Sequence, residues 1–457
     1  MHSKRLSRRL LLRVFASGSA SLLVSSLIAS CGPTPAPAAT EVPAEQTAVA
    51  AGPTVPAKSE EKFTLRLMIN FIPEYLDWAQ KTLVPKWQET YPGGSIEVVP
   101  LDWSRLEEQL LTSKAAGSMP DLYRMGASFV PIAALNNLSI TLDERLKEWP
   151  DTSDFYEASM QGVTWDGKVW GLPDITAPRD YSYRKDLSDE AGVTIPDDWT
   201  WDDYLDAAVK LTIREDSKLV RMGSSCYMDF IEWMGILWSA NGRFLRQAKA
   251  AFNSEEGLWA LSWIKQRNNS IAPEGTAPLA ESPIPYIATG QWVIGYYQAI
   301  AFAVQLRQHA PDKLQYLTLP QPALKARRVA PALTDWIAIA VTTKYPDAAW
   351  DYLKLHGSVE SVLKYNENSG DLPPRKSAVG QSEYMRLPIV EKVMKEMDTF
   401  GQPYIKLPSY QRFDLIIKPM IEATVLGQKT AEEALAEGEK AVNEIMADYP
   451  EWPDTEV

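Results

Sequence analysis

Two spacings of apolar residues alternate along the chain beyond residue 62. A period of two is typical of a strand with one buried face, and spacings of three and four are typical of an amphipathic helix. The alternation predicts a β-α-β-α-β order, and hence a mostly parallel sheet with helices on both faces. The predicted strands are Phe63 to Phe71, Ser95 to Leu101 and Met119 to Met125, and the predicted helices are Tyr75 to Tyr91 and Trp103 to Ala116.

A second block of strands and helices is predicted from about residue 180 to residue 334. After it, Trp336 to Val341 is expected to be a strand, and Pro346 opens a helix because proline suits a first helical turn. Ala431 to Met446 is an amphipathic helix. Ligands of such sheets bind beyond the carboxyl ends of the strands. In the first block these ends lie at Phe71, Asp102 to Trp103 and Met125 to Phe129.

The first thirty residues have a different character. Five basic residues precede an uncharged stretch from Val14 to Ser30, which is shorter than the roughly 20 apolar residues of a spanning helix. This order is typical of a signal peptide over residues 1–30. Ile28-Ala29-Ser30 stands directly before Cys31, with small residues at the two positions next to the cysteine, as in a lipobox. We therefore expect a diacylglyceryl group on Cys31, with an ordinary signal peptide and an incidental cysteine as the alternative.

The segment from Ser7 to Arg13 also resembles a twin-arginine export motif, and the general secretory (Sec) route is the alternative. Residues 31–62 are rich in Pro, Ala, Thr, Val and Glu, and cannot build a core. We expect them to form a lipidated, disordered tether. Such a tether anchors a folded body to the cell membrane, on its extracytoplasmic side, without a spanning helix.

Charge and cysteine content exclude several classes of function. Residues 1–30 hold five of the 46 basic residues and none of the 59 acidic ones, so their removal leaves a net charge of −18. This argues against nucleic acid and against anionic lipid surfaces, which require basic faces. Cys226 is then the only free cysteine, and only His309 and His356 remain, without metal-ligand spacing. We expect no metal and no cofactor.

Motifs of common enzymes are absent from the sequence: it has no GxSxG, P-loop, GxGxxG or HExxH pattern. Pairs of carboxylates remain open, since many acidic residues can pair by accident. All 16 tryptophans follow the leader, and flat rings suit the apolar faces of sugars. We expect Trp87, Trp259, Trp263 and Trp350 to pack in the core, and Trp233, Trp238 and Trp336 are the candidates for a binding site.

Several segments stand in a characteristic order and spacing: Leu110 to Leu122, Gly167 to Pro173, Tyr183 to Trp201, Ala251 to Glu256, Thr289 to Gln291, Leu319 to Pro320, Pro346 to Trp350, Gly370 to Pro373 and Gly427 to Leu435. Together they resemble the extracellular solute-binding protein family 1, which includes maltose-binding protein. The resemblance covers nearly all of residues 63 to 449.

This resemblance implies an α/β fold of two lobes, periplasmic-binding-protein-like and of type II. Each lobe would be a mostly parallel sheet flanked by helices, and the solute would bind in the cleft between the lobes. Hinge segments are implied near Pro173 to Arg179, Thr334 to Trp336 and Pro373 to Arg375. The implied lobes are residues 63–176 with 337–373, and residues 177–336 with 374–457.

Ligand contacts in this family come from loops beside the shared segments. Relatives place a polar residue and an aromatic one after the third strand, and cleft aromatics before a segment equivalent to Asn241-Gly242. Tyr410, Gln411 and Arg412 lie in a region that lines the cleft in relatives. Carried over by position, the implied ligand-binding residues are Ser128, Phe129, Glu232, Trp233, Trp238, Tyr297, Gln298, Asp335, Trp336, Arg375 and Arg412.

The implied function is that of a monomeric substrate-binding lipoprotein that passes a carbohydrate, such as an oligosaccharide, to the permease subunits of an ABC importer. The alternatives are a secreted carbohydrate-active enzyme and a sensor lipoprotein for a non-sugar polar solute. Ile300 stands near a position where relatives have a stacking tryptophan, and Ser128 stands where Asp or Asn is common. These departures leave the sugar class open. Arg375 and Arg412, if both face the cleft, would favour an anionic ligand.

Overall fold

The structure is a computed structural model that describes residues 61–70, 73–102, 105–216, 218–226, 228–272 and 284–456. The predicted signal peptide, the lipidation site at Cys31 and all but the end of the predicted tether lie outside the described residues, as do Phe71 and Trp103. Among the described helices, none is both long enough and apolar enough to cross a membrane.

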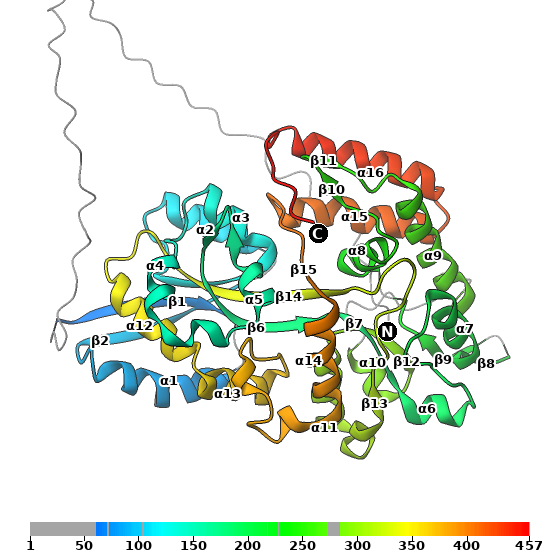
Figure 1. The fold of residues 1–457 in the computed structure, drawn as a ribbon, viewed down its shortest axis with the longest axis horizontal. Coiled ribbons are helices and arrows are strands. Elements are labelled where there is room, and N and C mark those ends of the chain that lie inside the picture. Colours follow the sequence, from blue (N-terminus) through cyan, green and yellow to red (C-terminus); the bar gives the residue numbers. More distant parts are fainter. Residues whose placement is uncertain are drawn as a thin grey trace, which may run out of the picture. The chain divides into compact units, whose positions relative to one another are not determined.

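The first sheet contains the strands predicted at the start of the folded part. β1 (Phe63–Ile69) pairs in parallel with β2 (Gly94–Pro100) and with β3 (Leu122–Gly126). β14 (Ala330–Ile339) pairs with β3 in the antiparallel sense and continues the sheet to β15 (Gly401–Pro403). The order is β15-β14-β3-β1-β2, so chain segments that are 200 residues apart lie side by side (Figure 1).

Both faces of this sheet are covered by helices because its strands have apolar residues on both sides. Leu65 and Leu67 of β1 pack in one cluster with Trp87 of α1 (Pro73–Gln88), whereas Met68 packs in another cluster with Leu106 of α2 (Leu106–Ala115). Successive residues of a strand point to opposite faces. On the first face α1 contacts α12 (Pro346–His356) and α13 (Val359–Ser369).

The second sheet has the order β13-β7-β12-β9-β8. Its central strand β12 (Trp292–Tyr297) pairs in parallel with β9 (Lys218–Ser224) and antiparallel with β7 (Asp180–Arg184). β13 (Leu317–Thr318) and β8 (Ile213–Glu215) form its edges. The main helices around it are α7 (Trp201–Leu211), α8 (Phe230–Ser239), α9 (Glu255–Ile271) and α11 (Ala299–His309).

Two crossing strands connect the two sheets. β6 (Leu172–Pro178) leaves the first sheet and leads through Arg179 into β7, and β14 returns antiparallel to it. Thr176 also bridges Leu372, which brings a third segment to the crossing. The family resemblance implies hinges in these segments, and their role as hinges stays a prediction. The lobe limits at residues 176 and 336 stay a prediction, because β14 pairs with strands on both sides of the crossing.

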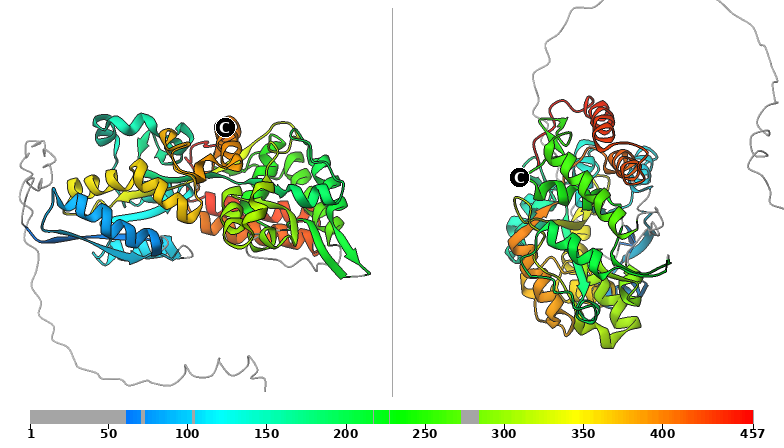
Figure 2. Two further views of the ribbon diagram at one scale, coloured as in Figure 1. Left: turned by 90° about the horizontal axis from the view of Figure 1, so that it is seen from below. Right: turned by 90° about the vertical axis from the view of Figure 1, so that its right-hand side faces the viewer.

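The C-terminal part is helical, as the apolar spacing predicts. α14 (Pro388–Phe400) leads to β15, and α15 (Tyr410–Val425) packs beside α16 (Ala431–Met446), as the orange and red ribbons show (Figure 2). The remaining elements are short: α3 (Val130–Leu135), α4 (Asp143–Glu148), α5 (Glu157–Gly162), β4 (Thr164–Trp165), β5 (Lys168–Val169), α6 (Lys185–Glu190), β10 (Leu245–Arg246), β11 (Lys249–Ala250) and α10 (Ile284–Thr289).

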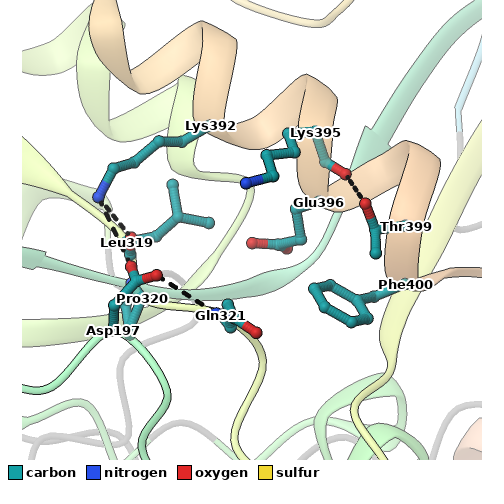
Figure 3. A pocket seen from close by; sticks show the side chains of 9 residues that line it. All are labelled: Asp197, Leu319, Pro320, Gln321, Lys392, Lys395, Glu396, Thr399 and Phe400. Carbon is teal, nitrogen blue, oxygen red and sulfur yellow. Dashed lines mark hydrogen bonds and ion pairs between the residues drawn. The ribbon is translucent and has the colours of Figure 1, made fainter.

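A buried pair of carboxyl groups attaches α14 to the second sheet. Asp180 at the start of β7 lies beside Glu396 of α14, and both residues are more than nine-tenths buried. Burial raises the pKa of Asp180 to about 7, and it raises the pKa of Glu396 well above its ordinary value. Glu396 also borders a cavity of about 320 Å³, together with Lys392 and Phe400 (Figure 3). One shared proton is therefore needed to keep the two carboxyl groups in contact.

This pair makes the stability of the fold depend on pH. The folded state holds protons that the unfolded chain releases near pH 4, so the stabilisation is complete below about pH 4 and is lost as pH rises through about 7. Glu396→Gln keeps a hydrogen-bond donor toward Asp180 without a titrating group. We expect it to raise stability at pH 9 by on the order of 1–3 kcal/mol and to change little at pH 5.

Thermal unfolding at the two pH values measures this effect. Glu391→Gln changes an exposed carboxylate on the same helix and is the matched control. Equal stability of the wild-type protein and Glu396→Gln at pH 9 would show that the pair does not share a proton.

Candidate functional site

A cavity of about 510 Å³ lies at the carboxyl ends of β3, β6 and β12, beside the middle of β14. This volume is within the range of small-molecule sites, roughly 300–1,000 Å³. One wall comes from the first sheet and its helices, and the other from the second sheet, α8 and α15. Aromatic side chains on the two walls are Phe129, Tyr297, Tyr365, Tyr404 and Tyr410.

The wall on the first sheet is organised by Arg124, a nearly fully buried residue of β3. Its Nε donates to Asp174 Oδ2 at 2.7 Å, and its Nη1 donates to Asn70 Oδ1 at 3.0 Å. Its Nη2 lies 3.1 Å from Asp335 Oδ2 on β14. One guanidinium therefore joins β3, β6, β14 and the residue that follows β1 at the edge of the cavity. The fork of donors in arginine suits this role, since it can face several oxygens at once.

Carboxyl groups outnumber cations on this wall. Burial raises the pKa of Asp335 to about 7, and the negative charges of Asp174 and Asp371 act in the same direction. Arg124 lowers this pKa but does not outweigh them. Burial likewise raises the pKa of Asp174 and of Asp371 above the ordinary value. Hydrogen-bond donors and positive charge from a ligand would stabilise the ionised form of these carboxyl groups.

The opposite wall is centred on Arg179, which follows β6. Its guanidinium lies over the ring of Tyr297, 4.8 Å from the centroid, and its Nη1 lies 3.5 Å from Asp229 Oδ1. Asp229 Oδ1 also accepts the amides of Ile231 and Glu232 at 2.8 and 3.1 Å, and so caps α8. A carboxylate at a helix N-terminus is stabilised there by the free amides and the helix dipole.

Two polar groups on the cavity walls have no hydrogen-bond partner among the described residues: the hydroxyl of Tyr404 and the Nε of Arg179. The Tyr404 side chain is buried, and a buried donor without a partner is unfavourable by about 1–3 kcal/mol. Next to them, the ring of Tyr410 stacks on Phe230 and lies 6.4 Å from Phe129. The cavity thus offers flat apolar surfaces beside unsatisfied polar groups.

The comparison with known sequences decides the family. Residues 73–362 match the bacterial extracellular solute-binding proteins. The chain belongs to this family.

Relatives and solved structures agree with this assignment. An uncharacterised lipoprotein of Streptomyces antibioticus is 32% identical over 29% of this chain and 30% of its own length. The arabinooligosaccharide-binding protein of Halalkalibacterium halodurans is 25% identical over 62% of this chain and 65% of its own length. The alignments with these two relatives therefore span less than two thirds of each.

The fold is also that of a solved solute-binding protein. The structure of an ABC transporter solute-binding protein from Thermotoga lettingae, bound to α-D-tagatose, has a TM-score of 0.73 and 24% sequence identity. It covers 84% of this chain and 100% of that chain. The two-lobed fold that the sequence predicts is confirmed.

The cavity brings together five of the predicted ligand-binding residues of this solute-binding protein. Ser128 and Phe129 follow β3, Tyr297 and Gln298 lie at the end of β12, and Asp335 lies on β14. All five are at the carboxyl ends of strands or on the crossing strand, where the sheet rule places ligands. Their role in binding stays a proposal.

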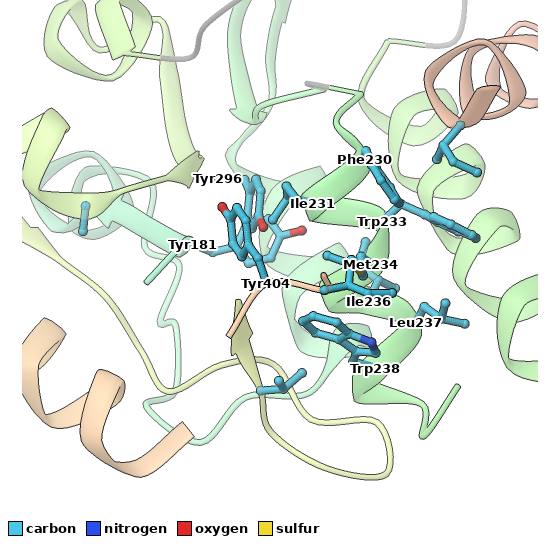
Figure 4. Packing of buried hydrophobic residues seen from close by; sticks show 14 of the residues in the cluster. Tyr181, Phe230, Ile231, Trp233, Met234, Ile236, Leu237, Trp238, Tyr296 and Tyr404 are labelled. Carbon is cyan, nitrogen blue, oxygen red and sulfur yellow. The ribbon is translucent and has the colours of Figure 1, made fainter. Parts of the chain in front are cut away.

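The three predicted tryptophans lie elsewhere, and this corrects their interpretation as cleft residues. Trp233 and Trp238 are on α8, all of whose residues are buried, and they pack inside the second lobe (Figure 4). Trp336 is also fully buried, donates from Nε1 to the Gly126 carbonyl at 2.9 Å, and packs against Gly171, where a Cβ atom would collide with its ring. Asp335 and Trp336 are neighbours on a strand, so only one of them can face the cavity.

Three charged residues of the predicted site are also placed outside the cavity lining. Glu232 is fully buried and binds Arg267 at 2.5 Å and the hydroxyl of Tyr181 at 2.8 Å. Arg375 donates to Asp154 at 2.7 Å in the first lobe. Arg412 is exposed on α15. Each charge is satisfied within the fold or by solvent, so the argument for an anionic ligand from Arg375 and Arg412 no longer holds.

Sequence reasoning missed Arg124, Arg179, Tyr365, Asp371 and Tyr404 as cavity residues. The signal for Arg124 was present, since a lone arginine inside an apolar strand must have a buried partner. The others lie in segments with no distinctive pattern. The described residues contain no group of three or more potential metal ligands. Cys226 is buried, and burial raises its pKa to about 11, so its thiol stays protonated at neutral pH.

Substitutions of a cavity residue and of a core residue should differ in their effect on the free energy of unfolding. Tyr404→Phe removes a hydroxyl that has no protein partner, so we expect the free energy of unfolding to stay unchanged or to rise by up to about 1 kcal/mol. Trp336→Ala should lower it by about 3–5 kcal/mol, because it removes a fully buried ring. Denaturant unfolding of both variants checks the contrast, and a large loss in Tyr404→Phe would contradict it.

Proposed function

We propose that this protein captures a carbohydrate between its two lobes and delivers it to the permease of an ABC importer. The observation that carries the proposal is the cavity itself, where aromatic rings lie beside polar groups that lack protein partners. Phe129, Tyr297 and Tyr410 can stack on the apolar faces of sugar rings. The Tyr404 hydroxyl, the Arg179 Nε and the Asp335 carboxyl can bind sugar hydroxyl groups.

Relatives support a carbohydrate as the ligand class. The Halalkalibacterium protein is named for arabinooligosaccharides, and the Thermotoga structure contains α-D-tagatose. A cavity of about 510 Å³ has room for more than one sugar ring, because small-molecule sites of roughly 300–1,000 Å³ hold drug-sized ligands. This is consistent with a short oligosaccharide.

The arrangement of the two walls explains how binding would be signalled. Residues of one wall belong to the first sheet, residues of the other belong to the second, and β6 and β14 join them. A solute that touches both walls binds the closed form more tightly than the open form. This difference in affinity shifts the equilibrium toward the closed form. The closed form would then dock on the permease, so that the permease recognises the loaded receptor.

Location follows from the N-terminal sequence. We propose that Cys31 carries the lipid anchor and keeps the receptor at the outer side of the cell membrane, close to the permease. The Streptomyces relative is named a lipoprotein, which supports this. Neither the permease nor the ATPase is part of this chain.

A thermal-shift screen of the full-length protein tests the ligand class. The panel contains arabino- and malto-oligosaccharides, their monosaccharides, uronates and phosphorylated polyols. A ligand that binds only the folded state adds about 2.7 kcal/mol at a hundredfold excess over its dissociation constant, which raises the unfolding midpoint by several degrees. We expect such a shift with at least one saccharide.

A pair of tyrosine variants locates the site. Tyr297→Ala should abolish the shift, because this ring lies on the cavity wall. Tyr345→Ala should retain it, since this half-buried tyrosine stacks on Phe63 at 4.3 Å, in the first lobe. If no saccharide shifts the midpoint, or if the bound saccharide is cleaved, the transport-receptor proposal is overturned.

The anchor has its own test. Cys31→Ser should leave the folded body intact but move the protein from the membrane fraction to the soluble fraction, because the thioether-linked lipid cannot form on serine. Cell fractionation and mass spectrometry of the N-terminal peptide measure both changes. Cys226→Ser is the control, since that thiol is buried in the fold and has no expected role in anchoring. Retention of Cys31→Ser in the membrane fraction would exclude a lipid anchor at this residue.

A further inference from the structure

The two walls of the cavity differ in charge. The wall on the first sheet has the carboxyl groups of Asp174, Asp335 and Asp371 around one cation, Arg124. Asp335 and Asp371 line the cavity, whereas Asp174 lies behind Arg124 and holds its Nε. One positive charge offsets one of three negative charges, so this wall is negative when all of the groups are ionised.

The cations that line the cavity on the other side do not correct this imbalance. Arg179 is 3.5 Å from Asp229, and Lys418 is 3.0 Å from Asp414 on α15. The remaining described groups near Asp371 are neutral: the side chains of Ser369 and Tyr365 hydrogen-bond its carboxyl group. Arg179 also lowers the pKa of Asp335 from the other wall, but it is shared with Asp229, and Arg124 is the main cation that lowers the pKa of Asp371.

Burial makes the excess charge unfavourable. Arg124 and Asp174 have side chains that are only 3% and 2% exposed, and Asp335 is 10% exposed, so water screens them poorly. The raised pKa of Asp335, about 7, and the raised pKa of Asp371 agree with this picture. A positive group of a ligand at this wall would supply the missing charge and would be held by charge-assisted hydrogen bonds.

The facing wall is complementary to a different part of the ligand. The Tyr404 hydroxyl is more than nine-tenths buried and unpartnered, and the Arg179 Nε beside it is a free donor. Both can bind hydroxyl oxygens, and the aromatic rings of Phe129 and Tyr297 flank them. A ligand complementary to both walls is polyhydroxylated on one side and cationic on the other.

We propose that the solute is an amino sugar, or a short oligosaccharide that contains one, whose ammonium group contacts Asp335 and Asp371. The inference rests on the proposed function and specifies its ligand class. The same geometry disfavours uronates and sugar phosphates, because they would bring a further negative charge to a buried acidic wall.

Matched sugars test the charge preference directly. Isothermal calorimetry with the full-length protein compares glucosamine, galactosamine and mannosamine with glucose, galactose and mannose, and compares the chitosan disaccharide with cellobiose. Each pair differs by one amino group in place of a hydroxyl group on each ring. We expect at least one amino sugar to bind about tenfold tighter or more than its neutral counterpart, equivalent to about 1.4 kcal/mol.

Variants link the preference to the acidic wall. Asp371→Asn removes one charge with little change of shape, and it should reduce the preference for the amino sugar, taken as the ratio of its affinity to that of the neutral sugar, about tenfold. Asp335→Asn should act in the same direction. Glu360→Gln is the control, because it removes a carboxylate from an exposed pair with Lys86, outside the cavity. Thermal unfolding confirms that each variant is folded.

The outcomes separate this inference from the proposed function. Neutral saccharides that bind as tightly as their amino counterparts, or more tightly, overturn the amino-sugar inference and leave the receptor function in place. An amino-sugar preference that survives in both Asp371→Asn and Asp335→Asn overturns the assignment of the acidic wall. If no saccharide of either kind binds, both the inference and the carbohydrate receptor are overturned.

Discussion

The ion pairs of Arg124 are the constraint on which the ligand cavity depends. Strands β3, β6 and β14, together with Asn70 after β1, meet at this guanidinium, and these segments are far apart in the sequence. A buried cation without partners would be strongly unfavourable, so the fold must bring Asp174 and Asp335 to the same place. These two aspartates lie on the strands that join the lobes. The cavity wall and the crossing between the lobes are therefore one structure, because Asp335 lines the cavity and lies on a connecting strand.

The aromatic residues of α8, in the second lobe, pack in the core and do not line the cavity. α8 is buried on all sides, and Trp233 and Trp238 fill the space between it and neighbouring elements. Glu232 on the same helix is satisfied by Arg267 and Tyr181 rather than by a ligand. Only the N-terminal turn of this helix, through Asp229 and Ile231, reaches the cavity. The helix thus contributes its cap to the site and its body to the core.

Much of the fold could be predicted, because the patterns that specify it are local. The strand at residue 63, the helix that ends at Met446 and the hairpin around Gly167 follow from apolar spacing and turn residues. Of the site, Ser128, Phe129, Tyr297, Gln298 and Asp335 were predicted because they lie near strand ends. Tyr404 and Asp371 were not, since they lie in loops whose place depends on the packing of α14 and α13.

The sequence by itself determined the alternation of strands and helices, the family and the strand ends that line the cavity, because these depend on residues close together in the chain. Only the tertiary structure decided which of two adjacent residues, Asp335 or Trp336, faces the cavity. The strand period requires that they point apart but does not say which way. Long-range contacts fix the orientation of the two side chains: Trp336 packs against Gly171 and donates to the Gly126 carbonyl, and Asp335 forms an ion pair with Arg124.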